Sequence, residues 1–344
     1  MPAFARPGRP LLAAVFGAFA LTAQAADTPR DTWHAAFQSG YDALAASAQT
    51  LQQSATAYCD APDDTGRARL VADWRAAFLD WQAIRFVDFG PIEQDSRAWQ
   101  IQFWPDAKNL VARKVSYALK QENAAVQDLV DDSGVALQGF PAIEYLLYDP
   151  AMQDGDDALP AANTCLLLTA IGGHLELTTA TLAEDWRAFG NFYRQQDRYE
   201  HRTVEAALNG LEILQDRRLA DPMGLRGNTR HNPYLGDAWR SGQSLAAIQA
   251  SIEGLDQYFK PGLQARLTAA GHADLAQRLD QQLQNTLDEF QALPTAMAPL
   301  LADEAGYAQL QSLYIEVTQL EQVLAGRIAP ALGVTRGFNA SDGD

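Results

Sequence analysis

The sequence has few of the residues and none of the motifs that mark common catalytic and metal centres. It contains five histidines and two cysteines in 344 residues. No H-E-x-x-H, G-x-S-x-G, Walker loop or dinucleotide fingerprint occurs in it. His174 and Glu176 lie two apart, so a helix would turn them to different faces, and His201 and Glu205 are more typical of a surface pair. Standard zinc-peptidase, serine-hydrolase and nucleotide-binding sites therefore have no support in the sequence.

Long apolar runs are also missing, apart from a short one at the N-terminus. Arg6 and Arg9 precede the apolar residues 11–21, and small residues at 23–25 follow them. This order is typical of a secretory signal peptide, and the run is too short to span a membrane. We expect residues 1–25 to be removed, with cleavage after Ala25. The mature chain is then periplasmic and has no transmembrane segment.

Basic residues are scarce relative to acidic ones. The formal charge is −17, and loss of the signal peptide, with two arginines and no acid, makes it −19. A strongly acidic surface argues against nucleic acid or an anionic membrane as the partner. It is compatible with cation binding, and equally with the simple solubility of an exported protein.

Strand signals are almost absent, and long segments carry apolar residues at spacings of three and four. The chain is therefore predicted to be all-α, built from two packed helical bundles. Its length favours two domains, at residues 26–195 and 196–344. Helices are predicted at about 30–58, 66–87, 107–121, 140–148, 158–192, 200–220, 242–259, 262–292 and 304–331.

Two long segments between these helices are candidates for function. Residues 88–106 are rich in aromatic and acidic side chains, and residues 221–241 combine Gly, Pro and Asn with several arginines. Long structured loops in compact bundles are often functional. Trp104 is expected to anchor the first segment or to line a ligand site.

Cys59 and Cys165 are the two cysteines of the chain. In an oxidising compartment, a disulfide between them is the favoured prediction, and it would join the first helix pair to the helix that contains Cys165. The alternative is two separate buried thiols.

One carboxylate stands out in the stretch GFPAIEYLLY at residues 139–148. Glu144 falls beside the apolar face formed by Phe140, Ile143 and Leu147. A carboxylate in such a place must be paired, hydrogen-bonded or bound to a metal. Glu93, Asp95, Asp106 and Glu144 are each set among apolar or aromatic neighbours, and the candidates for metal ligands are Glu144, Glu93 and Asp106. The alternative is helix capping, for which Asp106 is well placed, or pairing with Arg85, Arg97 or Arg240.

Several stretches together resemble the imelysin family. They are FGPIEQD at 89–95, FWPD at 103–106, GFPAIEYLLYD at 139–149, WRSGQSL at 239–245 and the ending LGVTRGFNASDGD at 332–344. The resemblance implies an exported all-α protein of two bundles with its site at their interface. It also implies a proposed metallopeptidase activity, and a link to bacterial iron uptake.

The family pattern Gly-x-His-x-x-Glu maps onto residues 139–144, but Pro141 takes the place of the histidine. Proline suits a first helical turn and offers no donor atom to a metal. We therefore expect Glu144 to hydrogen-bond or to pair with an arginine across the bundle interface. No catalytic residue is assigned. The predicted binding residues are Glu144, Pro141, Gly139, Arg85, Glu93, Asp106, Trp104, Arg240 and Ser241.

Three functions remain open at this point. The preferred one is a non-catalytic component of bacterial iron acquisition that binds an iron-related ligand or an envelope protein. The second is a metal-dependent peptidase of the imelysin type, using a divalent metal or iron. The third is a scaffold that docks onto a membrane receptor through residues 88–106.

Overall fold

The computed structural model describes residues 1–2, 28–121, 125–227 and 229–334, and the regular elements within them are all helical. This confirms the all-α prediction. Apart from its first two residues, the predicted signal peptide lies outside the described residues, as does most of the motif at 332–344. The α-helices are α1 (Pro29–Asp60), α2 (Asp64–Ile84), α3 (Arg97–Ile101), α4 (Leu110–Leu119), α5 (Val126–Asp132), α6 (Gly139–Tyr148), α7 (Ala162–Gln195), α8 (Arg198–Ile213), α9 (Ser244–Gly254), α10 (Lys260–Ala269), α11 (Ala273–Glu289), α12 (Ala298–Leu301), α13 (Glu304–Val323) and α14 (Ala329–Ala331).

Shorter helical turns connect or extend these helices. The 3₁₀ turns are η1 (Gly90–Ser96), η2 (Val135–Leu137), η3 (Pro150–Met152), η5 (Pro233–Leu235) and η7 (Phe290–Ala292). Three π-helical segments continue α8, α9 and α13: η4 (Leu214–Ala220), η6 (Leu255–Phe259) and η8 (Leu324–Ile328). The predicted loop at 88–106 thus contains η1 and α3.

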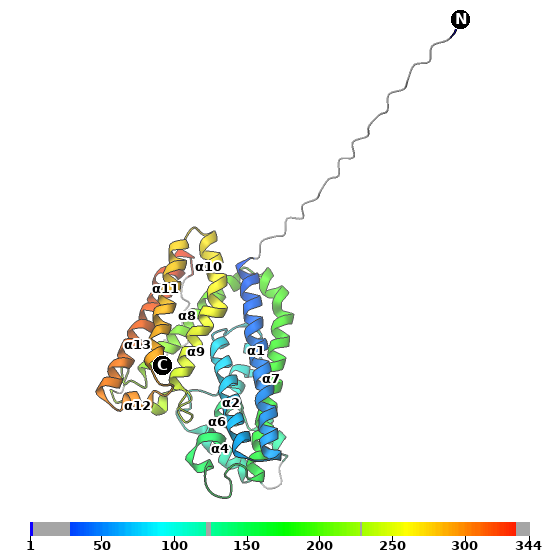
Figure 1. Ribbon diagram of the computed structural model, residues 1–344, viewed down its shortest axis with the longest axis vertical. Coiled ribbons are helices and arrows are strands. Elements are labelled where there is room, and N and C mark those ends of the chain that lie inside the picture. The colour runs from blue at the N-terminus through cyan, green and yellow to red at the C-terminus, as the bar shows by residue number, and fades with distance from the viewer. Residues whose placement is uncertain (3–27, 122–124, 228, 335–344) are drawn as a thin grey trace.

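The helices form two groups that pack side by side (Figure 1). The first group contains the long helices α1, α2 and α7. The short α4 and α6 lie near one end of them, and α3 and α5 pack against α7. Trp186 of α7 is fully buried and packs against Phe37 and Tyr41 of α1. A disulfide joins Cys59 to Cys165, with their Cα atoms 5.5 Å apart, which confirms the predicted link between α1 and α7.

The second group contains α8 to α13, and two of its predicted boundaries were wrong. The helix predicted to end at 259 continues through η6 into α10, as far as Ala269. The helix predicted at 262–292 is broken instead at Gly271, whose φ of +80° suits a glycine and ends α10. The domain division near residue 195 stays a prediction, although α7 ends at Gln195 and α8 begins at Arg198.

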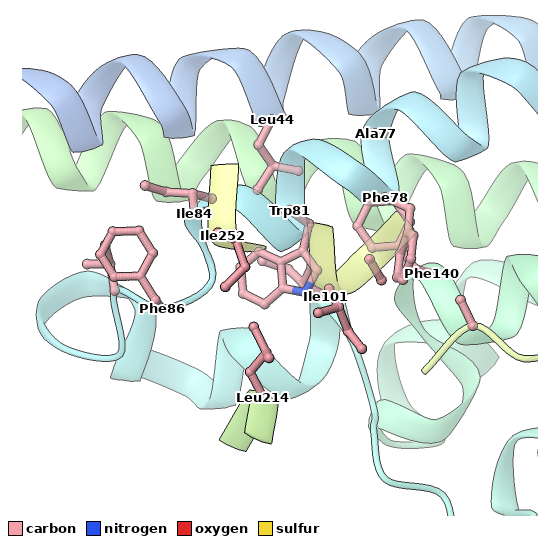
Figure 2. Close-up of a cluster of buried hydrophobic side chains, with 14 of the residues drawn as sticks. Leu44, Ala77, Phe78, Trp81, Ile84, Phe86, Ile101, Phe140, Leu214 and Ile252 are labelled. Carbon is pink, nitrogen blue, oxygen red and sulfur yellow. The ribbon is translucent and has the colours of Figure 1, made fainter. Parts of the chain in front are cut away.

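The two groups meet most closely where α9 crosses α2. Gly254 permits this contact, because a Cβ at that position would lie 1.8 Å from the carbonyl oxygen of Ala83. Ile252 of α9 and Leu214 of η4 both approach Trp81 of α2 in the shared apolar cluster (Figure 2). The two helix groups therefore share a continuous hydrophobic core at their interface, as within a single domain.

Helix α7 is long and apolar enough to cross a membrane by length and composition alone. Half of its most apolar stretch is nevertheless buried inside the fold, where α7 packs against α1 and α6. The core helix of a soluble protein passes the same test, and the absence of a transmembrane segment from the mature chain stays a prediction.

Candidate functional site

A cavity of about 420 Å³ lies between the two helix groups beside Glu144. We call it the Glu144 cavity. Each group contributes part of its lining. The first group supplies Trp74, Phe78, Trp104, Asp106, Phe140, Pro141, Glu144 and Asp149, among others, and the second supplies Asn232, Tyr234, Asp237, Trp239 and Arg240. The structure thus brings parts of both long segments, 88–106 and 221–241, to one site.

The start of α6 is shaped by its glycine. Gly139 has a φ of +67°, and a Cβ there would lie 2.1 Å from the carbonyl oxygen of Ile101. A larger residue would push α6 away from α3. Pro141 follows in the first turn, where its missing N–H leaves no intrahelical bond unmade. Trp74 of α2 then donates to the carbonyl oxygen of Phe140 at 3.3 Å, which fixes this end of the helix.

Glu144 is 5% exposed and is held from across the interface. The backbone N–H and the hydroxyl of Ser241 both donate to its Oε1, at 2.8 Å each. Burial raises the pKa of Glu144 to about 7, and the Ser241 bonds and nearby Arg240 oppose that rise. Among the described residues, no hydrogen bond reaches Oε2 of this side chain. That oxygen is available to a ligand in the cavity.

Arg240, next to Ser241, pairs with a different carboxylate. Its Nε lies 2.8 Å from Oδ2 of Asp149, and its Nη2 donates to Asn109 at 3.1 Å. The guanidinium also stacks 4.3 Å from the ring centre of Trp239. The expected bond from Glu144 across the interface is therefore present, but its donor is a serine, and the arginine goes to Asp149.

A buried polar network lies deeper in the interface, and sequence analysis found only one of its members, Arg85. Asp237 is its centre and is 2% exposed. Oδ2 of Asp237 lies 2.8 Å from Nη2 of Arg218 and 3.2 Å from Nη1 of Arg85, and its Oδ1 accepts from Gln102 at 2.6 Å. Gln82 accepts from both guanidinium groups.

The missed members of this network had only weak local signals. Asp237 lies in the segment 221–241, which is a candidate for function as a whole, but no local pattern distinguishes this aspartate from its neighbours. Arg218 stands beside Leu219 and Ala220, which are fully buried, and a guanidinium so close to an apolar face needs a buried partner. The sequence positions of Gln82 and Gln102 do not indicate that their side chains form a hydrogen bond.

Most of the predicted binding residues come together at this interface. Glu144, Pro141, Asp106, Trp104 and Arg240 line the cavity. Ser241, Gly139 and Arg85 support it through the contacts described above. Glu93 does not join them: its Oε2 accepts from the backbone N–H of Gly90 at 2.8 Å, and it lines a separate surface pocket with His201 and Arg202.

The acidic side chains present do not fit a metal ion at this site. Oδ1 and Oδ2 of Asp106 accept from the backbone N–H groups of Leu110 and Val111, at 2.6 and 2.9 Å. Asp106 thus bonds the first N–H groups of α4, as its alternative interpretation as a helix cap predicted, although the N-cap residue itself is Asn109. Pro141 has no donor atom, and Glu93 lies elsewhere. Across the described parts of the chain, no group of three or more His, Cys, Asp or Glu side chains is placed to hold a metal.

Solved structures of similar fold include two bacterial proteins. An imelysin-like protein from Psychrobacter arcticum 273-4 matches with a TM-score of 0.77 and 21% identity, over 91% of this chain and 99% of that one. An iron-regulated protein A precursor from Parabacteroides distasonis ATCC 8503 matches with a TM-score of 0.63 and 15% identity, over 88% and 97% of the chains. A comparison with curated proteins gives no match.

The family itself is shown by a different comparison. The family model described as Imelysin matches residues 37–324, which is most of the chain and includes every element that builds the interface site. This protein belongs to the imelysin family.

Proposed function

We propose that this protein is an exported, non-catalytic imelysin that binds a small ligand in the Glu144 cavity as part of bacterial iron acquisition. The proposal rests on the hydrogen bonding of Glu144, which is a buried carboxylate. Its Oε1 accepts two hydrogen bonds from Ser241, and its Oε2 accepts none from the described residues. A peptidase would need a metal or a general base aimed at a bound water. At this position, Pro141 replaces the ligand that would share a metal with Glu144.

The lining suggests the chemistry of the ligand. Aromatic rings of Trp104, Phe140 and Trp239 form apolar walls, and Arg240 is already paired with Asp149. Among the described lining residues, the buried carboxyl of Glu144 keeps one oxygen without a hydrogen bond, and it changes protonation close to neutral pH because its pKa is about 7. A compact ligand with a flat apolar part and an N–H or O–H donor fits such a site.

Export and iron acquisition rest on two further observations. The N-terminal 25 residues have the order of a signal peptide. The Parabacteroides distasonis relative is named as an iron-regulated protein precursor, which supports both points by analogy. If the assignment to iron acquisition is right, the transcript rises in iron-starved cells of the native host. An unchanged transcript would contradict that assignment and leave the cavity's role to be tested separately.

Native mass spectrometry of the protein purified from the periplasm of its native host tests the ligand directly. We expect a stoichiometric small mass on the wild type that is lost in Trp239→Ala, a wall of the Glu144 cavity. Phe192→Ala is the matched control, because Phe192 is a similarly bulky aromatic residue that is 47% exposed and does not line this cavity. A bare wild-type protein, or equal retention by both variants, would argue against the proposal.

A further inference from the structure

A second, larger cavity lies across the same interface, on the other side of the Asp237 network. Its volume is about 610 Å³, and we call it the Trp99 cavity. Its walls are mostly apolar and include Trp81, Phe86, Trp99, Trp104, Ile213 and Leu214. Trp99 and Ile213 are 46% and 45% exposed, which is unusual for large apolar side chains and marks the mouth of the cavity.

Four charged residues line the Trp99 cavity, and two of them are neutralised by partners outside it. Asp88 pairs with Arg202 at 2.9 Å, and Arg217 pairs with Asp221 at 3.4 Å. These two pairs leave no net charge at the cavity. The remaining two lining charges are both guanidinium groups.

Arg85 and Arg218 share a single carboxylate. Both contact Oδ2 of Asp237, at 3.2 and 2.8 Å, and within the described parts of the chain their other hydrogen bonds go to the neutral side chains of Gln82, Gln102 and Ser251. Two positive charges with one negative charge leave a formal excess of one positive charge in the interior. A buried excess charge is costly unless a counter-charge accompanies it.

The same two arginines also keep unused hydrogen-bond donors. Nε of Arg218 is buried and has no partner among the described residues. Arg85 uses only Nη1 in the hydrogen bonds of the described residues, and its side chain stays 20% exposed. Buried donors without partners are rare in folded proteins, and they indicate a missing acceptor.

The backbone around the cavity is irregular in the way that functional sites often are. Leu214, Arg217 and Arg218 belong to the π-helical segment η4, and Leu255 begins the π-helical segment η6. Single π-helical turns within α-helices occur frequently at functional sites. Here the two segments face one cavity from neighbouring helices.

We propose that the Trp99 cavity binds a small organic anion, whose aromatic or aliphatic body lies along Trp99 and Trp104 and whose carboxylate or sulfonate meets Arg85 and Arg218. The anion supplies the missing counter-charge, and its oxygens accept from the unused donors. This cavity shares Gln102, Trp104 and Pro105 with the Glu144 cavity, but Arg85 and Arg218 line only this one. The proposal does not depend on the function proposed for the Glu144 cavity.

The electrostatics of Arg85 agree with this assignment. Burial, and then repulsion by Arg218, lower the pKa of Arg85 to about 10, although Asp237 opposes the change. A bound anion next to Arg85 would stabilise its charged form. Binding should therefore persist at every pH at which both the anion and Arg85 are ionised.

A matched pair of fluorescent probes tests the proposal on the mature protein. 8-Anilinonaphthalene-1-sulfonate carries the required charge, and N-phenyl-1-naphthylamine has the same rings without the sulfonate. We expect one sulfonate probe per chain, bound at least about tenfold more tightly than the neutral probe, since charge-assisted hydrogen bonds are strong. Arg85→Met should weaken the sulfonate probe by about tenfold or more and leave the neutral probe unchanged.

Two further variants keep the test decisive. Ile213→Glu changes an exposed residue at the mouth, so the fold is retained, and its negative charge should weaken the sulfonate probe even if Arg85→Met does not fold. Arg187→Met removes an exposed arginine elsewhere on the surface and should change nothing. Equal affinity for the two probes, or sulfonate binding that Ile213→Glu leaves as in the wild type, would overturn the proposal.

Discussion

Ser241 donates both its backbone N–H and its hydroxyl to one atom, Oε1 of Glu144, at 2.8 Å each. The two residues are 97 positions apart and belong to different helix groups. The carboxylate of the family motif therefore links the two helix groups in this protein. The motif's histidine, which would bind a metal together with this carboxylate, is replaced here by Pro141.

Glu144 should make stability depend on pH in a recognisable way. Its pKa rises on folding from an ordinary 4.5 to about 7, mainly because of burial. The stability that the protonated carboxyl contributes is fully present below pH 4.5 and is lost as pH rises through 7, by up to about 3 kcal/mol. Glu144→Gln should lack this loss, so its stability relative to wild type should increase between pH 4.5 and 8.

Urea unfolding at several pH values measures this difference. Glu253→Gln is a suitable control, because Glu253 is exposed on α9 and bonds only to Gln249 of the same helix among the described residues. It should follow the wild type throughout. Parallel pH profiles for wild type and Glu144→Gln would show that Glu144 titrates normally.

Pro141→His should restore a metal-binding pair. Histidine at 141 would lie three residues before Glu144 on the same side of α6, and both positions line the cavity. Titration calorimetry with zinc should detect binding in this variant and no Glu144-dependent site in the wild type. Pro141→Ala controls for loss of the proline itself. Tight stoichiometric zinc or iron binding by the wild type that disappears in Glu144→Gln would contradict the non-catalytic assignment.

Gly139→Ala should destabilise the protein strongly. The residue has a φ of +67°, and an added Cβ would lie 2.1 Å from the carbonyl oxygen of Ile101. We expect a loss of about 2–4 kcal/mol in the free energy of unfolding. Gly326→Ala is the matched control, because nothing lies within 4 Å of its added Cβ, and it should change stability little. Similar stabilities for the two variants would show that α6 can move away from α3.

Removing the disulfide should also lower stability. The bond between Cys59 and Cys165 spans 106 positions, so the chain-entropy model gives a loss of up to about 4–5 kcal/mol for the double alanine variant. Chemical unfolding under non-reducing conditions measures it. Mass spectrometry provides the check: two free thiols in the exported wild type would exclude the bond.

Much of the fold could be predicted because helical periodicity is a local signal. The helix pattern found the long helices, but not the continuation of α9 through η6 into α10, since π-helical turns have no simple sequence pattern. The break at Gly271 follows from its positive φ, which a glycine permits but does not by itself predict. The short α5 was missed altogether.

The residues of the site could be predicted only where they lie in a stretch that resembles a family motif. Glu144, Arg240 and Ser241 lie in stretches that resemble a family, but which of the two donors reaches Glu144 depends on how the groups dock. Asp237 and Arg218 are buried partners, and Arg85 joins them from 152 positions before Asp237. Pairing over such a distance is decided by tertiary packing, which periodicity does not describe.

The most direct test of the central claim is an experimental structure of the protein purified from its native host, together with whatever molecule it retains. The account predicts a small molecule in the Glu144 cavity that contacts Oε2 of Glu144, with Oε1 still bonded to Ser241. A metal ion coordinated by Glu144, with Ser241 displaced from it, would contradict the account.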